Sequence, residues 1–201
     1  ATAGTTNIGV VDDLAGIVRA VTQAEAPAIV IGESFGGAVA LSFALAHPEL
    51  VHALVVLNSF PRFLPQTRLW LAITALRLVP WQTMPLVRRL TAFRLHSRHT
   101  HRSEIHRFLE VTRATRREGY LARLGILREY DVREPLGALR MPTLFLASEL
   151  DHLVPSVREG RYMAGRVPGA TLRVLPGHGH ICLIAPDLDL ERLLHEWRPD
   201  L

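Results

Sequence analysis

Residues 28–37, AIVIGESFGG, form a short apolar run that passes into a glycine-rich turn around Ser34. The run follows Pro27, and its continuous apolar character is typical of a strand buried on both faces of a parallel sheet. Residues 36–47 are small and apolar enough for a buried helix, which the proline at position 48 would end. The sequence therefore predicts that Ser34 lies on a tight turn between a strand and a helix.

Glycine stands two residues before Ser34 and two residues after it, at Gly32 and Gly36. In such a turn we expect a β-carbon at either position to collide with the neighbouring strand or helix as the backbone bends back. The turn would project the Ser34 hydroxyl above the sheet at the start of a helix, whose amides can stabilise an oxyanion. We therefore predict a nucleophilic serine. A phosphate-binding turn is the alternative, but it would require further glycines or a lysine.

Helix and strand patterns alternate on both sides of this turn. A helical pattern covers residues 8–21, and a second buried-strand pattern covers residues 52–57. The alternation returns later in the sequence, with strands expected at 143–147 and 171–175 and helices at about 156–166 and 188–197. This order predicts an α/β fold with a mainly parallel sheet, right-handed crossovers and helices on both faces.

The two sheet-forming stretches flank a segment that has no strand-like alternation. We predict that residues 1–59 and 141–201 form the α/β core, whereas residues 60–140 form a helical lid with helices at 66–78, 85–96, 103–116 and 120–130. Apolar lid residues would either favour a lipophilic substrate or simply pack against one another: the run Leu69–Leu76, Trp81, Met84 and Phe93.

A serine hydroxyl needs a base, and a neutral imidazole is the usual choice. Two histidines follow the last predicted strand in the run PGHGH at 176–180. We prefer His180 to His178 because the turn would end at His180, after which apolar residues return to the body of the protein.

The base in turn needs a carboxylate that fixes its tautomer and stabilises the imidazolium. Asp151 and Glu149 both follow the predicted strand at 143–147. We prefer Asp151, because the apolar residues and the helix-starting proline behind it place it at the inner turn. The end of the other internal strand holds Asn58, which cannot carry the negative charge.

The order of Ser34, Asp151 and His180, each on a loop after a parallel strand, resembles the α/β-hydrolase fold family over nearly the whole chain. The resemblance implies a serine hydrolase that uses no cofactor and cleaves a carboxylic ester, or a related acyl bond, of a small lipophilic substrate through an acyl-enzyme. It assigns one oxyanion donor to the backbone N–H of Phe35. Substrate contacts are expected from three further residues: Glu33, Phe60 and Leu153.

Members of this family carry further strands before the helix expected at 8–21, and one of their loops supplies the second oxyanion donor. We therefore expect this chain to be the C-terminal three-quarters of such a protein, with the strand at 28–31 as an exposed edge. A non-catalytic binding protein of the same fold is the competing interpretation. Carbon–carbon bond hydrolysis, cofactor-free peroxidation and acyl transfer also use this constellation.

Composition limits the remaining functions. Of 201 residues, 48% are hydrophobic and 21% are charged, which is typical of one folded domain and excludes a disordered chain. The single cysteine, Cys182, cannot form an internal disulfide, which favours a reducing, cytoplasmic location. No apolar run approaches the roughly 20 residues of a membrane-spanning helix, so we expect no stable membrane insertion.

The charge is unevenly distributed. Residues 60–140 hold 16 arginines against 6 acidic residues, a balance of +10, whereas the rest of the chain holds 7 against 13, or −6. This segment could attract an anionic partner, but no nucleic-acid recognition module accompanies it. We predict a small-molecule substrate as the partner, with no nucleic acid. We also predict no metal, because no carboxylate or cysteine lies at ligand spacing from the lid histidines: His96, His99, His101 and His106.

Overall fold

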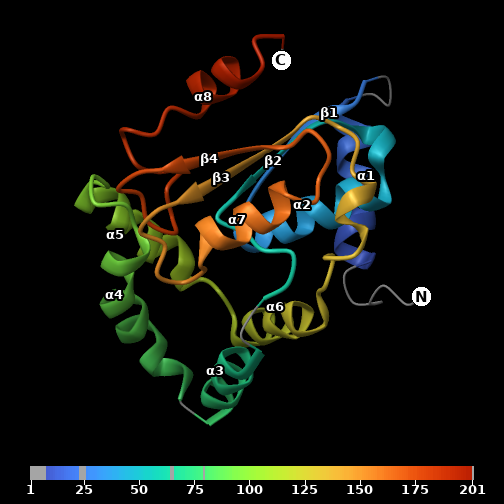
Figure 1. Ribbon diagram of the computed structural model, residues 1–201. Coiled ribbons are helices and arrows are strands. Elements are labelled where there is room, and N and C mark those ends of the chain that lie inside the picture. Colours follow the sequence, from blue (N-terminus) through green and yellow to red (C-terminus); the bar gives the residue numbers. More distant parts are fainter. Residues whose placement is uncertain (1–7, 23–25, 64–65, 79, 201) are drawn as a thin grey trace.

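The computed structural model describes residues 8–22, 26–63, 66–78 and 80–200 (Figure 1). Its centre is a sheet of four parallel strands whose spatial order is also their order in the chain. Because all four strands run the same way, their carboxyl ends share one edge of the sheet, where the loops after the strands meet. The strands are β1 (Ala28–Glu33), β2 (Val51–Leu57), β3 (Thr143–Ser148) and β4 (Thr171–Leu175).

Helices cover both faces of this sheet, which confirms the predicted fold class. One apolar core joins a sheet face to α1 (Ile8–Val21), α2 (Phe35–Ala46) and α7 (Ser156–Ala164). A second core joins the opposite face to α8 (Leu190–Trp197). The alternation of side chains along β2 divides it between the two cores, since Val56 belongs to the first and Val55 to the second.

Burial of the strands follows from their positions in the sheet. Strands β2 and β3 are internal and almost wholly buried. Strand β1 pairs only with β2 among the described residues, and its Ile29 and Ile31 are 39% and 40% exposed. The pattern-based prediction that residues 28–31 are buried on both faces is therefore wrong, whereas the edge position expected for this strand from the family resemblance agrees with the structure.

The segment between β2 and β3 is helical, and its helices agree with the predicted ranges to within three residues at each end. Figure 1 shows α5 beside the carboxyl ends of β3 and β4. Three short 3-10 helices complete the described elements: η1 (Pro48–Leu50), η2 (Trp81–Thr83) and η3 (Pro135–Ala138). The four helices of the segment are α3 (Gln66–Leu78), α4 (Met84–Leu95), α5 (Arg102–Arg113) and α6 (Arg117–Glu129).

The apolar residues singled out from the sequence in the segment 60–140 divide between surface and core. Trp70 and Leu71 of α3 are exposed, whereas Ile73 packs into a small core that includes Phe60. Met84 at the start of α4 is buried. Trp81 is half-buried. Three further large residues of this set have side chains outside the described part of the structure: Leu69, Leu76 and Phe93.

Candidate active site

Ser34 occupies a strained turn between β1 and α2. Its φ of 56° and ψ of −118° lie in a region that residues other than glycine rarely adopt. Two hydrogen bonds hold the turn against the end of β2: the Ser34 N–H donates to the Leu57 carbonyl at 2.8 Å, and the Ser59 hydroxyl donates to the Ser34 carbonyl at 2.8 Å. The Ser34 side chain makes no capping bond to α2, which leaves its hydroxyl to contact other groups.

Glycine provides the space for this turn at two positions. A β-carbon on Gly32 would lie 2.4 Å from the carbonyl oxygen of Gly36, and one on Gly37 would lie 2.5 Å from Cβ of Ser59. A β-carbon on Gly36 would meet nothing within 4 Å beyond its own helix. The predicted collision at Gly36 is therefore wrong. The crowding falls on Gly37 instead, because that residue packs against the loop after β2.

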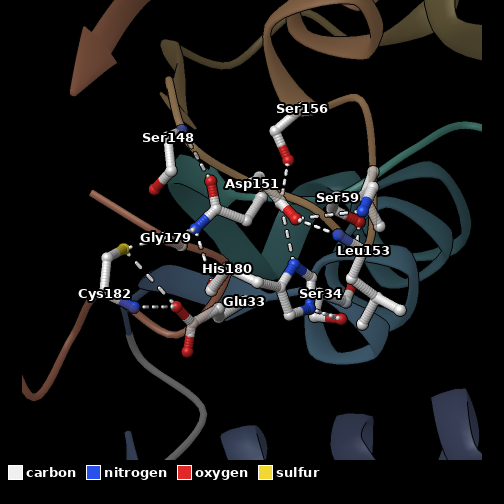
Figure 2. Close-up of polar contacts among 12 residues, drawn as sticks. Glu33, Ser34, Ser59, Ser148, Asp151, Leu153, Ser156, Gly179, His180 and Cys182 are labelled. Atoms are coloured by element: carbon white, nitrogen blue, oxygen red, sulfur yellow. Dashed lines mark hydrogen bonds and ion pairs between the residues drawn. The ribbon is translucent and has the colours of Figure 1, made fainter. Parts of the chain in front are cut away.

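The imidazole of His180 bridges the serine and a carboxylate (Figure 2). Its Nε2 lies 2.8 Å from Ser34 Oγ, and its Nδ1 lies 2.7 Å from Asp151 Oδ2. An ionised carboxylate can only accept, so Nδ1 carries the proton and donates to Asp151. Nε2 of the neutral ring then accepts from the Ser34 hydroxyl, which is the arrangement that general-base catalysis requires.

Asp151 is held as an ion although its side chain is fully buried. Burial by itself raises the pKa of Asp151, but the hydrogen bond and charge of His180 lower it, and Ser156 and the Val154 N–H lower it further. The net effect leaves the pKa of this carboxyl below its ordinary value. The Leu153 and Val154 amides each donate to Oδ1 at 2.9 Å, so both oxygens have partners.

The lowered pKa of Asp151 predicts a pH dependence of stability. A carboxyl with a depressed folded-state pKa stabilises the fold above its unfolded-state pKa of about 3.9, and this contribution is lost as the pH falls through the folded-state value. We expect the drop in unfolding free energy from pH 6 to pH 3 to be smaller in Asp151→Asn than in the wild type. Urea unfolding at the two pH values measures this, and equal drops in both proteins would contradict it.

The two rival residues make other contacts. The His178 ring lies 2.9 Å from the Ser97 hydroxyl through Nδ1, and the same hydroxyl accepts from the Gly179 N–H at 3.2 Å. Glu149 accepts from the Gly177 N–H at 3.0 Å. Among the described residues, His178 is not hydrogen bonded to Ser34, and Glu149 is not hydrogen bonded to His180. His178 instead belongs to a seam between the loop after β4 and the segment after α4.

This seam continues along the backbone. The Ile181 N–H donates to the Leu95 carbonyl at 2.7 Å, and Ile181 forms a parallel bridge with His96. A β-carbon on Gly179 would lie 2.5 Å from the His96 carbonyl oxygen, so the two segments are in direct backbone contact. The loop that carries His180 is therefore fixed from the helical segment as well as from the sheet.

The other predicted residues lie around the serine in different ways. Phe35 is the first residue of α2, where a backbone N–H has no intrahelical acceptor, and the Arg123 guanidinium lies over its ring. Phe60 is buried and lines a shallow recess together with Val154 and Glu159. Leu153 is 47% exposed beside Asp151. Contact of these residues with a substrate stays a prediction.

Glu33 contacts the histidine loop through its carboxylate. Its Oε1 accepts from the Cys182 N–H at 3.2 Å, and burial raises the pKa of Glu33 although Cys182 opposes the shift. Burial, followed by the charge of Glu33, raises the pKa of the Cys182 thiol to about 12. This thiol is therefore protonated at neutral pH and is a poor nucleophile. A substrate contact for Glu33 also stays a prediction.

Three polar residues that support the site were not predicted from the sequence as parts of it: Ser97, Ser156 and, as a structural support, Asn58. Asn58 has a positive φ of 46° and is 1% exposed. A buried asparagine at the end of an apolar strand was a usable signal, because a buried amide needs partners. Ser97 lies far from the site in sequence, and no local pattern marks it.

Among the described residues, no helix is long and apolar enough to cross a membrane. Within the same part of the chain, no three His, Cys, Asp or Glu side chains are grouped closely enough to hold a metal ion.

The α/β hydrolases are a class of proteins with a parallel sheet between helices. At the carboxyl ends of its strands, a serine is hydrogen bonded to a histidine, which is hydrogen bonded to a carboxylate. A family profile described as the alpha/beta hydrolase fold matches residues 6–185. This chain belongs to the α/β-hydrolase fold family.

Curated relatives and solved structures agree with this assignment. The pimeloyl-[acyl-carrier protein] methyl ester esterase of Pectobacterium atrosepticum is 32% identical, over 91% of this chain and 74% of its own length. The provisionally named carbamate hydrolase RutD of Serratia proteamaculans is 29% identical, over 83% of this chain and 64% of its own. A thermophilic esterase from Thermogutta terrifontis has a similar fold, with a TM-score of 0.81, 23% identity, and coverage of 96% of this chain and 72% of its own.

Proposed function

We propose that this protein is a serine hydrolase that cleaves a carboxylic ester through an acyl-enzyme, with Ser34 as nucleophile, His180 as base and Asp151 as the carboxylate that orients the base. The unbroken chain of hydrogen bonds through these side chains, at 2.8 and 2.7 Å, carries the proposal. Two further observations support it: the strained backbone of Ser34, and relatives whose names describe ester and carbamate hydrolysis.

The first half of the reaction acylates Ser34. The Ser34 oxygen attacks the ester carbonyl carbon while His180 Nε2 takes the hydroxyl proton. Charge develops on the carbonyl oxygen, and we assign one donor for it to the Phe35 N–H, which has no intrahelical acceptor at the start of α2. The tetrahedral intermediate collapses when the carbon–oxygen bond to the leaving alcohol breaks, and the imidazolium returns its proton to the alcohol oxygen.

The second half releases the acid. His180 removes a proton from water, the hydroxide oxygen attacks the acyl carbon, and the bond to the Ser34 oxygen breaks as that oxygen regains a proton. Asp151 remains ionised throughout and stabilises the imidazolium that forms twice in the cycle. Its own hydrogen bonds from backbone amides keep it in place.

The proposal includes a lipophilic group on the substrate, which partly buried Phe35 beside Ser34 would contact. Phe35, the residue after the nucleophile, packs against a buried apolar cluster that joins the helical segment to α2 and the acid loop. That cluster consists of Ala38, Phe60, Leu127, Tyr130 and Val154.

A fluorophosphonate probe followed by peptide mapping tests the proposal, because the probe phosphonylates a serine activated by a neighbouring base and releases fluoride. We expect one labelled peptide, which contains Ser34, and no labelling in Ser34→Ala. Wild-type protein that is folded by circular dichroism and still leaves Ser34 unlabelled would favour a non-catalytic binding protein instead.

A further inference from the structure

The Asn58 side chain connects three loops of the site. It lies at the end of β2, and its Oδ1 accepts from the Ser148 N–H at 2.8 Å, at the end of β3. Its Nδ2 donates to the carbonyl oxygens of His180 at 2.8 Å and Gly179 at 3.4 Å. One buried side chain therefore links the strand beside the nucleophile turn to the start of the acid loop and to the backbone of the proposed base.

The partners of Asn58 require a side chain that accepts and donates at the same time, which an amide does at every pH. The Ser148 N–H can only donate and the His180 carbonyl can only accept, so the side chain must offer an acceptor and a donor at once. A carboxylate would turn an acceptor toward the two carbonyls, and an apolar side chain would leave all these groups unsatisfied in a buried place. Asparagine also tolerates the positive φ better than most residues.

We infer that Asn58 is a positioning residue, which sets the distance between His180 and Ser34 by holding the His180 carbonyl. The inference rests on the proposed function, since it concerns the same base. The Nε2 to Oγ contact of 2.8 Å has little tolerance, and misplacement by about 1 Å can lower a rate by roughly 100-fold. Asn58 is not bonded to the ring itself, so it acts through the His180 backbone.

Asn58→Asp is the sharpest test, because it keeps the size of the side chain and replaces the NH2 donor by a carboxyl oxygen that can ionise. Titratable groups face this position from the loop after β4 and from the end of β1. The Cys182 thiol lies 3.3 Å from Nδ2, Glu33 contacts Cys182, and His180 contacts Nδ2 through its backbone carbonyl. Burial, the carbonyl dipoles and Glu33 would all raise the pKa of the introduced carboxyl. The protonated acid can donate to the His180 carbonyl, whereas the carboxylate cannot.

We expect kcat of Asn58→Asp to be about 10- to 100-fold below the wild type at pH 8, with KM changed less than threefold. The ratio of variant to wild-type kcat should recover toward pH 6 as the carboxyl becomes protonated. Asn58→Gly is the matched control, because it accepts the positive φ but cannot donate at any pH, so its ratio should stay low and flat. Rates are normalised to the folded fraction measured by circular dichroism.

A readout without turnover separates this inference from the proposed function. The downfield proton resonance of His180 Nδ1–H reports its bond to Asp151, and we expect it to weaken in Asn58→Asp at pH 8 and to return at pH 6. An unchanged resonance together with wild-type kcat would overturn the role of Asn58. If the resonance changes in Asn58→Asp as expected but the probe does not label Ser34 of the wild-type protein, the hydrolase proposal is overturned and the positioning role of Asn58 is kept.

Discussion

Replacing His180 with alanine is expected to lower kcat for a p-nitrophenyl ester by roughly 10⁴- to 10⁶-fold, because the Ser34 hydroxyl then has no base. The expectation follows from the 2.8 Å contact between Nε2 and Ser34 Oγ. Steady-state kinetics measures kcat, and KM should change far less, since the imidazole contributes mainly to the transition state. The melting temperature of each variant shows whether the fold is retained.

His178→Ala is the matched control, since it removes the other histidine of the same loop. Its ring contacts Ser97 rather than Ser34, so we expect kcat to fall by no more than about tenfold. A severe loss in His178→Ala beside a mild loss in His180→Ala would reverse the assignment of the base.

Gly32→Ala is expected to destabilise the protein by about 3 kcal/mol or more, because the new β-carbon meets backbone and not a movable side chain. The carbonyl oxygen of Gly36 would be 2.4 Å away, and the first turn of α2 would have to shift to relieve the contact. Such a shift would also move Ser34, so hydrolysis should fall together with stability. Urea unfolding monitored by circular dichroism measures the free energy.

Gly36→Ala provides the opposite result within the same turn. Its β-carbon meets nothing within 4 Å beyond its own helix, and alanine favours a helix over glycine by up to about 1 kcal/mol. We therefore expect unchanged or slightly increased stability. Equal destabilisation by the two substitutions would mean that crowding does not decide where this turn needs glycine.

The sequence was sufficient for the fold class because its patterns are local. Apolar runs at β2 and β3 and helical periodicity at α1 each specify an element without knowledge of its neighbours. Burial of β1 was predicted wrongly, because an apolar run does not show whether a second strand covers its far side. Ile29 and Ile31 are exposed for that reason. The edge position of β1 was expected only from the family resemblance, because it is a property of the assembled sheet and not of a local pattern.

The site was predictable where chemistry and loop position agreed. Ser34, Asp151 and His180 each follow a strand, and parallel strands bring such loops to one edge. The sequence could not separate Gly36 from Gly37, since spacing does not show which residue faces the loop after β2. It also could not identify Ser97, whose contact with the loop of His180 depends on how the helical segment packs.

The backbone contact between Leu95 and Ile181 connects only a short part of the helical segment, residues 95–97, to the loop of His180. Leu95 and His96 meet the loop of His180 through backbone atoms, so their conformation matters more than their side chains. The described exposed side chains of α3 and α4 make no hydrogen bond to this loop, so we expect substitutions there to leave it in place. If the helical segment were exchanged for that of another protein, we therefore expect the position of His180 to be kept best when residues 95–97 are left in place.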